Sequence, residues 1–119
     1  MNWKLDKNRP ICPQICEQLC ASIVSGELAP RQRLMSVRET AVDLGVNPNT
    51  VQRAFELLEQ QGILFSVRSA GWFVAEDTAV AQQIRQSLVQ DTLRSFFDEI
   101  AALGISVDNA KDVVKEWQP

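Results

Sequence analysis

The chain has 119 residues, of which 45% are apolar and 23% charged, a balance typical of a globular protein. This length allows one small domain with an appended element, and it excludes a binding domain joined to a catalytic domain of ordinary size. The chain has no histidine, the commonest general acid or base and the commonest metal ligand. No apolar run approaches the roughly 20 residues of a membrane helix. We therefore expect a cytoplasmic protein that is not an enzyme, contacts no membrane and needs no metal or cofactor.

The net charge of −3 is unevenly distributed along the chain. Residues 1–75 carry eight Lys or Arg against seven acidic residues, whereas residues 76–119 carry four against eight. Affinity for nucleic acid depends on where cations face rather than on their total. The acidic total therefore weakens the hypothesis that residues 1–75 bind nucleic acid, but it does not exclude it. We expect two domains, residues 1–75 and residues 76–119.

Two amphipathic helices are predicted in the first third of the chain. Apolar residues recur at three-to-four spacing from Pro10 to Ser25, which indicates a first helix. Ser36 and Glu39 form a capping box at the start of a second helix, and Gly45 ends it. The segment between the two helices is expected to be a turn and a short connector.

A third helix and a hairpin follow almost without interruption. Asn47 is a favourable N-cap for a helix from Pro48 to Gln61. The runs Ile63–Val67 and Trp72–Ala75 read as two short strands joined by the cationic tip Arg68–Gly71. The first 75 residues are therefore mainly α with a small β-hairpin.

The tail is predicted to hold a long helix from Asp77 to Leu103 and a short one from Val107 to Trp117, capped by Ser106. Two such helices cannot bury so wide an apolar stripe alone, so we expect a second copy related by two-fold symmetry. A tail of this size is also too small to enclose a metabolite, and we expect no ligand pocket in one subunit. The residues expected at the dimer interface are Ile84, Leu88, Phe96, Phe97, Ile100, Leu103, Val114 and Trp117.

The most informative stretch is Val37–Leu58, where two helices are joined by a turn of only about three residues. This connection matches a helix-turn-helix unit, and a hairpin directly after it would be the wing. In such a unit the second helix enters the major groove with its N-terminal residues first. Asn and Gln pair with adenine edges and Arg reaches guanine or phosphate, although Asn47 and Thr50 could also serve only to cap and solvate the helix start. The side chains at that position are Asn47, Asn49, Thr50, Gln52 and Arg53.

The run from Pro10 to Val74 carries a dense pattern of motif residues: Gln14-Ile15, Gly26–Pro30, Ser36–Ala41, Leu44–Val51, Ala54-Phe55, Leu58-Glu59, Gly62 and Gly71–Val74. This pattern resembles the N-terminal domain of the GntR family of bacterial regulators. The short tail, with Ala102–Ser106, and the variant Asn47–Thr50 further resemble the YtrA subfamily. The resemblance implies a winged helix-turn-helix DNA-binding domain followed by a helical dimerisation tail, in a dimeric repressor often encoded beside transporter genes.

Carried over by position, the resemblance implies DNA contacts from Arg38 on the second helix, from the recognition helix at Asn47, Asn49, Thr50 and Gln52, and from the wing at Arg68 to Gly71. The residues expected to contact DNA are Ser36, Arg38, Asn47, Asn49, Thr50, Gln52, Arg53, Arg68, Ser69 and Gly71. Some positions depart from the family pattern. The family pattern usually has Gly after Pro30, where this chain has Arg31. The wing keeps one of the two usual glycines and lacks the basic residue that usually lies between them. The helix contacts are therefore expected to matter more than the wing contacts.

Three cysteines, Cys12, Cys16 and Cys20, fall on one helical face. That spacing could seat a soft metal or form a redox switch. However, the chain has no His and no fourth Cys, and a disulfide within one helix at this spacing has poor geometry. We expect buried apolar thiols.

The leading hypothesis is a homodimeric repressor that binds a near-palindromic operator in double-stranded DNA. A winged-helix module that binds another protein is the main alternative, but polar residues such as Asn49 and Gln52 on the exposed face argue against it. A longer regulator fused to an aminotransferase-like domain is a third possibility, and the capped helix ending at Trp117 favours a chain of this length instead. The sequence identifies no active site and no effector.

Overall fold

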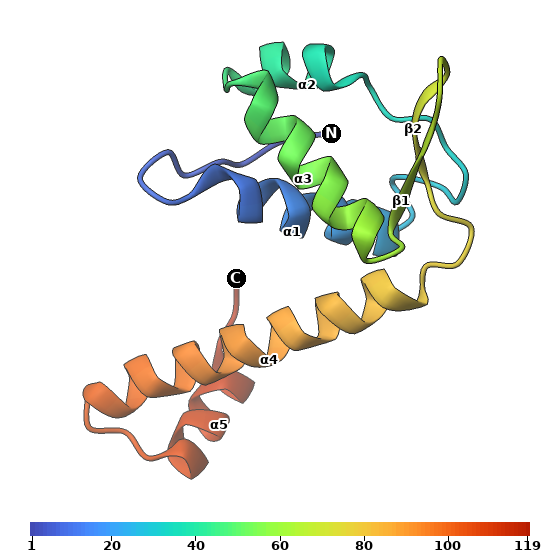
Figure 1. Cartoon of the computed structure of the whole chain (residues 1–119). Helices are drawn as coiled ribbons and strands as arrows, with labels where there is room; N and C mark the ends of the chain where they lie inside the picture. Colours follow the sequence, from blue (N-terminus) through green and yellow to red (C-terminus); the bar gives the residue numbers. More distant parts are fainter. The chain divides into compact units, whose positions relative to one another are not determined.

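The computed structural model describes all 119 residues. The elements are α1 (Ile11–Val24), α2 (Val37–Leu44), α3 (Pro48–Gln60), β1 (Leu64–Val67), β2 (Gly71–Val74), α4 (Ala79–Ala102) and α5 (Val107–Glu116). Figure 1 shows a mainly helical chain with one small hairpin, which confirms the predicted fold class. The chain divides into two compact units, Met1–Arg85 and Gln86–Pro119.

The predicted helix-turn-helix is present, and its boundaries are set by local hydrogen bonds. Ser36 Oγ accepts from the Glu39 amide at 3.0 Å, which forms one half of the predicted capping box and begins α2. Gly45 ends α2 in the left-handed conformation, with φ at +68°, a conformation that glycine adopts without the steric cost of a Cβ. Asn47 Oδ1 then accepts from the Asn49 amide at 2.8 Å and begins α3, with Pro48 in its first turn.

The core of the first unit lies between α1 and α3. Ile15 and Leu19 of α1 and Val51 and Phe55 of α3 are almost completely buried. α2 packs on α3, and the Trp72 ring meets the Phe55 ring edge-on at 5.5 Å between centroids. Since fully burying a side chain of this size contributes about 1.5–3 kcal/mol, the α1–α3 contact is a main source of stability. The other core members are Cys20, Ile23, Leu28, Leu34, Ala41, Leu44, Ala54, Leu58, Ile63, Leu64, Val74 and Ala81.

The predicted hairpin is present, and three of its four strand ends differ by one residue from the prediction. β1 begins at Leu64 instead of Ile63, and β2 runs from Gly71 to Val74 instead of Trp72 to Ala75. The two strands are antiparallel, and Leu64 lies opposite Val74. Ile63 is left to pack in the core beside the end of α3.

The connector after Pro30 also pairs with the hairpin, which the sequence analysis did not predict. The Arg31 amide donates to Val74 O at 2.8 Å, and the Leu34 amide donates to Trp72 O at 2.8 Å. Arg33 forms an antiparallel bridge with Phe73. β2 is therefore bonded on both edges, by β1 on one side and by residues 31–34 on the other.

Arg31 has a left-handed backbone, with φ at +68°. This conformation is unfavourable for residues with a Cβ. Arg31 follows Pro30 at the position where the family pattern has glycine. The turn therefore keeps its shape at a local cost, because the hydrogen bond from Arg31 to Val74 holds it.

The three cysteines of α1 differ in burial. Cys20 is buried, whereas Cys12 and Cys16 are half-buried. Burial raises the pKa of the Cys16 thiol from 9.0 to about 12, and the neighbouring Cys12 and Cys20 sulfurs add to the rise. Burial also raises the pKa of the Cys20 thiol from 9.0 to about 11, with a contribution from Glu17. The Cys16 thiol donates to Ala54 O at 3.7 Å, which joins α1 to α3.

The second unit consists of the later part of α4, together with α5. Ser106 Oγ accepts from the Asn109 amide at 3.3 Å and caps α5 as predicted. Ala110 is the one buried residue of α5. The long helix is slightly shorter than predicted, because it begins at Ala79 and ends at Ala102. Its first turns belong to the first unit, which extends to Arg85 and so passes the expected boundary at Ala75.

Replacing Arg31 with glycine should stabilise the protein. The substitution relieves about 1–2 kcal/mol of left-handed strain. It also costs about 0.5–1 kcal/mol, because glycine raises the conformational entropy of the unfolded chain. The difference should raise the free energy of unfolding by about 0.5–1 kcal/mol. Urea denaturation measures the change. Ala29→Gly is the matched control, because Ala29 has a negative φ, and it should lower stability. A loss of stability in Arg31→Gly would contradict the assignment of strain to this turn.

Stability should fall in the alkaline range because of the cysteines. The unfolded thiols lose their protons near pH 9.0, whereas the folded Cys20 and Cys16 thiols keep theirs until about pH 11 and about pH 12. The unfolded state therefore binds fewer protons above pH 9, and the free energy of unfolding decreases as the pH rises from there. Urea denaturation at pH 8 and pH 10 should show a smaller decrease for Cys16→Ala/Cys20→Ala than for the wild type. Equal decreases in the free energy of unfolding of the two proteins would contradict the assignment of the alkaline loss of stability to these cysteines.

Candidate nucleic-acid interface

The exposed face of α3 carries the predicted recognition residues. Val51, Ala54 and Phe55 are buried in the core, and this arrangement turns the other face of the helix outward. Asn49 and Arg53 are exposed and lie one helical turn apart, at i and i+4. Their amide and guanidinium groups are free to meet the edges of bases or phosphate oxygens.

The other polar residues of α3 already have partners within the chain. Asn47 Oδ1 is used by the helix cap, whereas its amide nitrogen has no acceptor within the chain and remains available as a donor. Gln52 Nε2 donates to Glu56 Oε1 at 2.8 Å, which orients the Gln52 amide and leaves its oxygen free. Thr50 is half-buried. Asn49 and Arg53 are therefore the predicted contacts on this helix that are exposed and have no side-chain hydrogen bond within the chain.

A groove of about 400 Å³ connects α3 to the start of α1. It is lined by Pro10, Ile11, Cys12, Asn49, Thr50 and Arg53. The start of α1 was not predicted beside the candidate recognition residues, because that proximity depends on the packing of α1 on α3. Cys12 thus borders the candidate interface, whereas Cys20 lies in the core.

The predicted contacts on α2 differ in accessibility. Arg38 is exposed and lines a shallow depression with acidic and apolar neighbours: Met35, Glu39, Val42 and Asp43. Ser36 is half-buried, and its hydroxyl oxygen is used by the α2 cap. The geometry therefore favours Arg38 over Ser36 as a contact with a ligand.

The wing presents Arg68 and Ser69 at its exposed tip. The Ala70 amide donates to Val67 O at 2.9 Å and closes the turn. Ser69 and Gly71 both have positive φ, at +69° and +110°. A Cβ at Gly71 would lie 3.5 Å from Arg33 Nε, so the pairing of residues 31–34 with β2 brings a second guanidinium to the wing.

The residues that could bind a metal are not grouped together. No set of three or more Cys, Asp or Glu side chains is placed to hold a metal ion, and the three cysteines are unpaired. None of the helices combines the length and apolar character required to span a bilayer.

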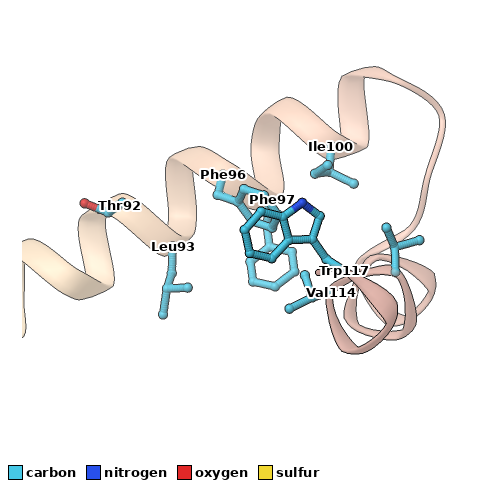
Figure 2. Close-up of a pocket in the computed structure, with 8 residues that line it drawn as sticks. Thr92, Leu93, Phe96, Phe97, Ile100, Val114 and Trp117 are labelled. Atoms are coloured by element: carbon cyan, nitrogen blue, oxygen red, sulfur yellow. The ribbon is translucent and has the colours of Figure 1, made fainter. Parts of the chain in front are cut away.

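The second unit has an apolar groove between α4 and α5, with a volume of about 550 Å³. Figure 2 shows Phe96, Phe97 and Ile100 of α4 opposite Trp117 and Val114. Leu93, Thr92 and Val113 complete the lining. A pocket in the tail was not expected. With Thr92 as the one polar residue in its lining, the groove suits an apolar side chain better than a polar metabolite.

The residues predicted to form a dimer interface fall into two groups. Ile84 packs against the core of the first unit, so its own chain already covers part of its apolar surface, and Leu88 is half-buried. The other six lie further along the second unit, to which Leu88 also belongs, and Leu103 and Trp117 are 77% and 69% exposed. These six are Phe96, Phe97, Ile100, Leu103, Val114 and Trp117.

Comparison with known proteins identifies relatives that span nearly the whole chain. Residues 13–74 match the family described as bacterial regulatory proteins, gntR family. The uncharacterized HTH-type transcriptional regulator YhcF of Bacillus subtilis is 32% identical over 117 residues, which covers 98% of this chain and 97% of YhcF. The HTH-type transcriptional repressor YtrA of Bacillus subtilis is 28% identical over 108 residues, which covers 90% of this chain and 83% of YtrA.

Solved structures agree with this relationship. A GntR family transcriptional regulator from Listeria monocytogenes has a TM-score of 0.82 at 33% identity, over 96% of this chain and 100% of that chain. The DNA-binding domain of AraR, solved in complex with operator ORE1, has a TM-score of 0.54 at 30% identity, over 63% of this chain and 94% of that chain. The members of the gntR family are transcription regulators and not enzymes. The chain therefore belongs to the GntR family of bacterial winged helix-turn-helix, DNA-binding transcription regulators, and it is similar to the YtrA-type members of that family.

Proposed function

We propose that this protein is a homodimeric repressor that binds a near-palindromic operator through α3 and the wing. The observation that carries the proposal is the exposed pair Asn49 and Arg53 on the outer face of the helix-turn-helix. In proteins with this unit the N-terminal part of the second helix reads the major groove. The operator complex of the similar AraR domain supports this use of the fold, and the YtrA relative, a repressor, supports repression.

The operator symmetry follows from the proposed dimer. Two copies related by a two-fold axis present two identical recognition helices, which read two inverted half-sites about one helical turn apart. The resemblance of the tail to the YtrA subfamily further supports an operon for a transporter as the regulated unit. This proposal assigns Asn49 and Arg53 to base or phosphate contacts, Arg38 to the phosphate backbone, and Arg68 with Ser69 to the wing contact.

The proposed dimer surface is the apolar groove of the second unit. Trp117, Val114 and Phe96 are 69%, 46% and 39% exposed, and large exposed apolar patches mark interaction sites. The Phe96 ring meets the Phe97 ring edge-on at 5.2 Å between centroids, so the patch is preformed. A second copy would fill this groove with the same apolar side chains, as a two-fold interface requires.

Selection of bound duplexes from a random DNA pool tests the DNA-binding part of the proposal. The wild type should enrich an inverted repeat, and Asn49→Ala should bind it about 5- to 150-fold more weakly, as expected for the loss of a good base contact worth about 1–3 kcal/mol. Gln60→Ala is the control, because Gln60 is an exposed polar residue in the last turn of α3, and it should bind like the wild type. No enrichment by a folded wild-type protein at low salt would contradict specific DNA binding and would point to a protein partner.

Sedimentation analysis of Val114→Asp tests the dimer surface. A carboxylate placed in an apolar interface without a partner costs more than about 1.4 kcal/mol, so the dimer Kd should rise at least about tenfold. Val42→Asp is the control, because Val42 is 84% exposed on α2, and its dimer Kd should stay unchanged. An unaltered Kd for Val114→Asp would place the dimer interface elsewhere.

A further inference from the structure

The segment before α1 forms an ordered loop that is held by one buried side chain. Gln14 of α1 is 4% exposed. Its Oε1 accepts from the Asp6 amide at 2.7 Å, and its Nε2 donates to Asp6 O at 2.9 Å, Pro10 O at 2.9 Å and Arg9 O at 3.3 Å. The two hydrogens of the Gln14 amide nitrogen are shared among these three carbonyls, and together with the bond from the Asp6 amide they fix the backbone of residues 6–10, because hydrogen bonds are costly to lose in a buried position.

The acidic residue of this loop is used within the loop. Asp6 Oδ1 accepts from the Asn8 amide at 2.9 Å, and Asp6 Oδ2 accepts from Arg9 Nε at 3.2 Å. The Asp6 carboxylate is therefore balanced by Arg9. Lys7 has no acidic partner among the ion pairs of the chain, and its side chain is exposed.

Lys7 lies at the turn between α2 and α3. Its Nζ is 3.5 Å from Gly45 O, two residues before the cap that begins the recognition helix. Figure 1 shows the loop, in dark blue before α1, on the same side of the first unit as this turn. The loop leads directly into Pro10, Ile11 and Cys12, which line the groove shared with Asn49 and Arg53.

We propose that the loop formed by residues 6–10 is an additional DNA-backbone contact, in which Lys7 binds a phosphate beside the N-terminus of α3 and Gln14 is the positioning residue. This inference rests on the proposed DNA-binding function and adds to it a residue remote in sequence from the helix-turn-helix. An ammonium has three donors, so Lys7 Nζ can keep its weak bond to Gly45 O and still donate to a phosphate oxygen. The free amides at the start of α3 favour a phosphate at the same place.

A purely structural role for Lys7 makes a different prediction. Gly45 O lies at the C-terminal end of α2, where a cation stabilises the helix dipole. If that were its only role, Lys7 would affect the melting temperature and not the binding of DNA. The salt dependence of DNA binding separates the two roles, because each neutralised phosphate contributes about −0.9 to the slope of log K against log salt.

The experiment measures the affinity of the full chain for two duplexes of equal length across a salt series, one selected by the wild type and one unrelated in sequence. Lys7→Gln should make the slope of log K against log salt shallower by about 0.9 on both duplexes. If the variant and the wild type bind equally at 1 M salt, this change makes the variant bind about eightfold more weakly at 0.1 M salt. Lys7→Arg should retain the wild-type slope. Gln14→Leu should make the slope shallower by the same amount, because Lys7 would no longer be positioned. The double variant Gln14→Leu/Lys7→Gln should have the same slope as Gln14→Leu alone.

Two comparisons complete the test. Lys4→Gln makes the same charge change in the same segment, where Lys4 is bonded through its backbone to Gln18, and it should alter the slope less than Lys7→Gln. Equal effects of Lys4→Gln and Lys7→Gln on the slope would overturn the inference. A lowered melting temperature of Lys7→Gln with an unchanged slope would overturn it as well.

Asn49→Ala should weaken binding to the selected duplex only. A wild type that binds neither duplex would overturn the proposed function, and the inference with it, whereas normal wild-type binding with an unchanged slope in Lys7→Gln would overturn the inference alone.

Discussion

The tight turn at Gly45 is the constraint on which the rest of the first unit depends. Its left-handed backbone reverses the chain within three residues, and the Val46 amide closes the turn by donating to Ala41 O at 3.0 Å. This connection fixes how α3 crosses α2, and so it decides which face of α3 is buried against α1. With Val51 and Phe55 inward, the polar face is left for a ligand. The recognition surface is thus a consequence of core packing.

Local chemistry made much of the fold predictable. Ser36, Asn47 and Ser106 each accept a backbone hydrogen bond at a helix start, and this interaction depends on residues only two or three positions away. The pairing of residues 31–34 with β2 was not predictable in the same way, because the connector has no alternating pattern and its bonds join positions about 40 residues apart. Likewise, Asn49 and Arg53 follow from the motif, whereas Lys7 and Arg33 reach the site through tertiary packing that no sequence spacing records.

The net charge of the chain gives a poor account of the charge on the proposed DNA-binding face. The total of −3 includes a tail in which acidic residues predominate. Exposed cations of the first unit include Lys7 on the loop before α1, Arg38 on α2 and Arg53 on α3, and Lys7 contacts the turn at Gly45. Since the field near a surface is dominated by the nearest charges at physiological ionic strength, a mildly acidic protein can still present a local cationic surface.

The double pairing of β2 has a consequence for the entropy of DNA binding. Because β2 is hydrogen-bonded to β1 on one edge and to residues 31–34 on the other, the base of the wing is ordered before any ligand arrives. Only the residues of the tip, Arg68 to Ala70, lie outside this strand pairing. Ordering a residue costs about 1–2 kcal/mol of conformational free energy, so a wing anchored in this way confines that cost to its tip and leaves more of the contact energy for affinity.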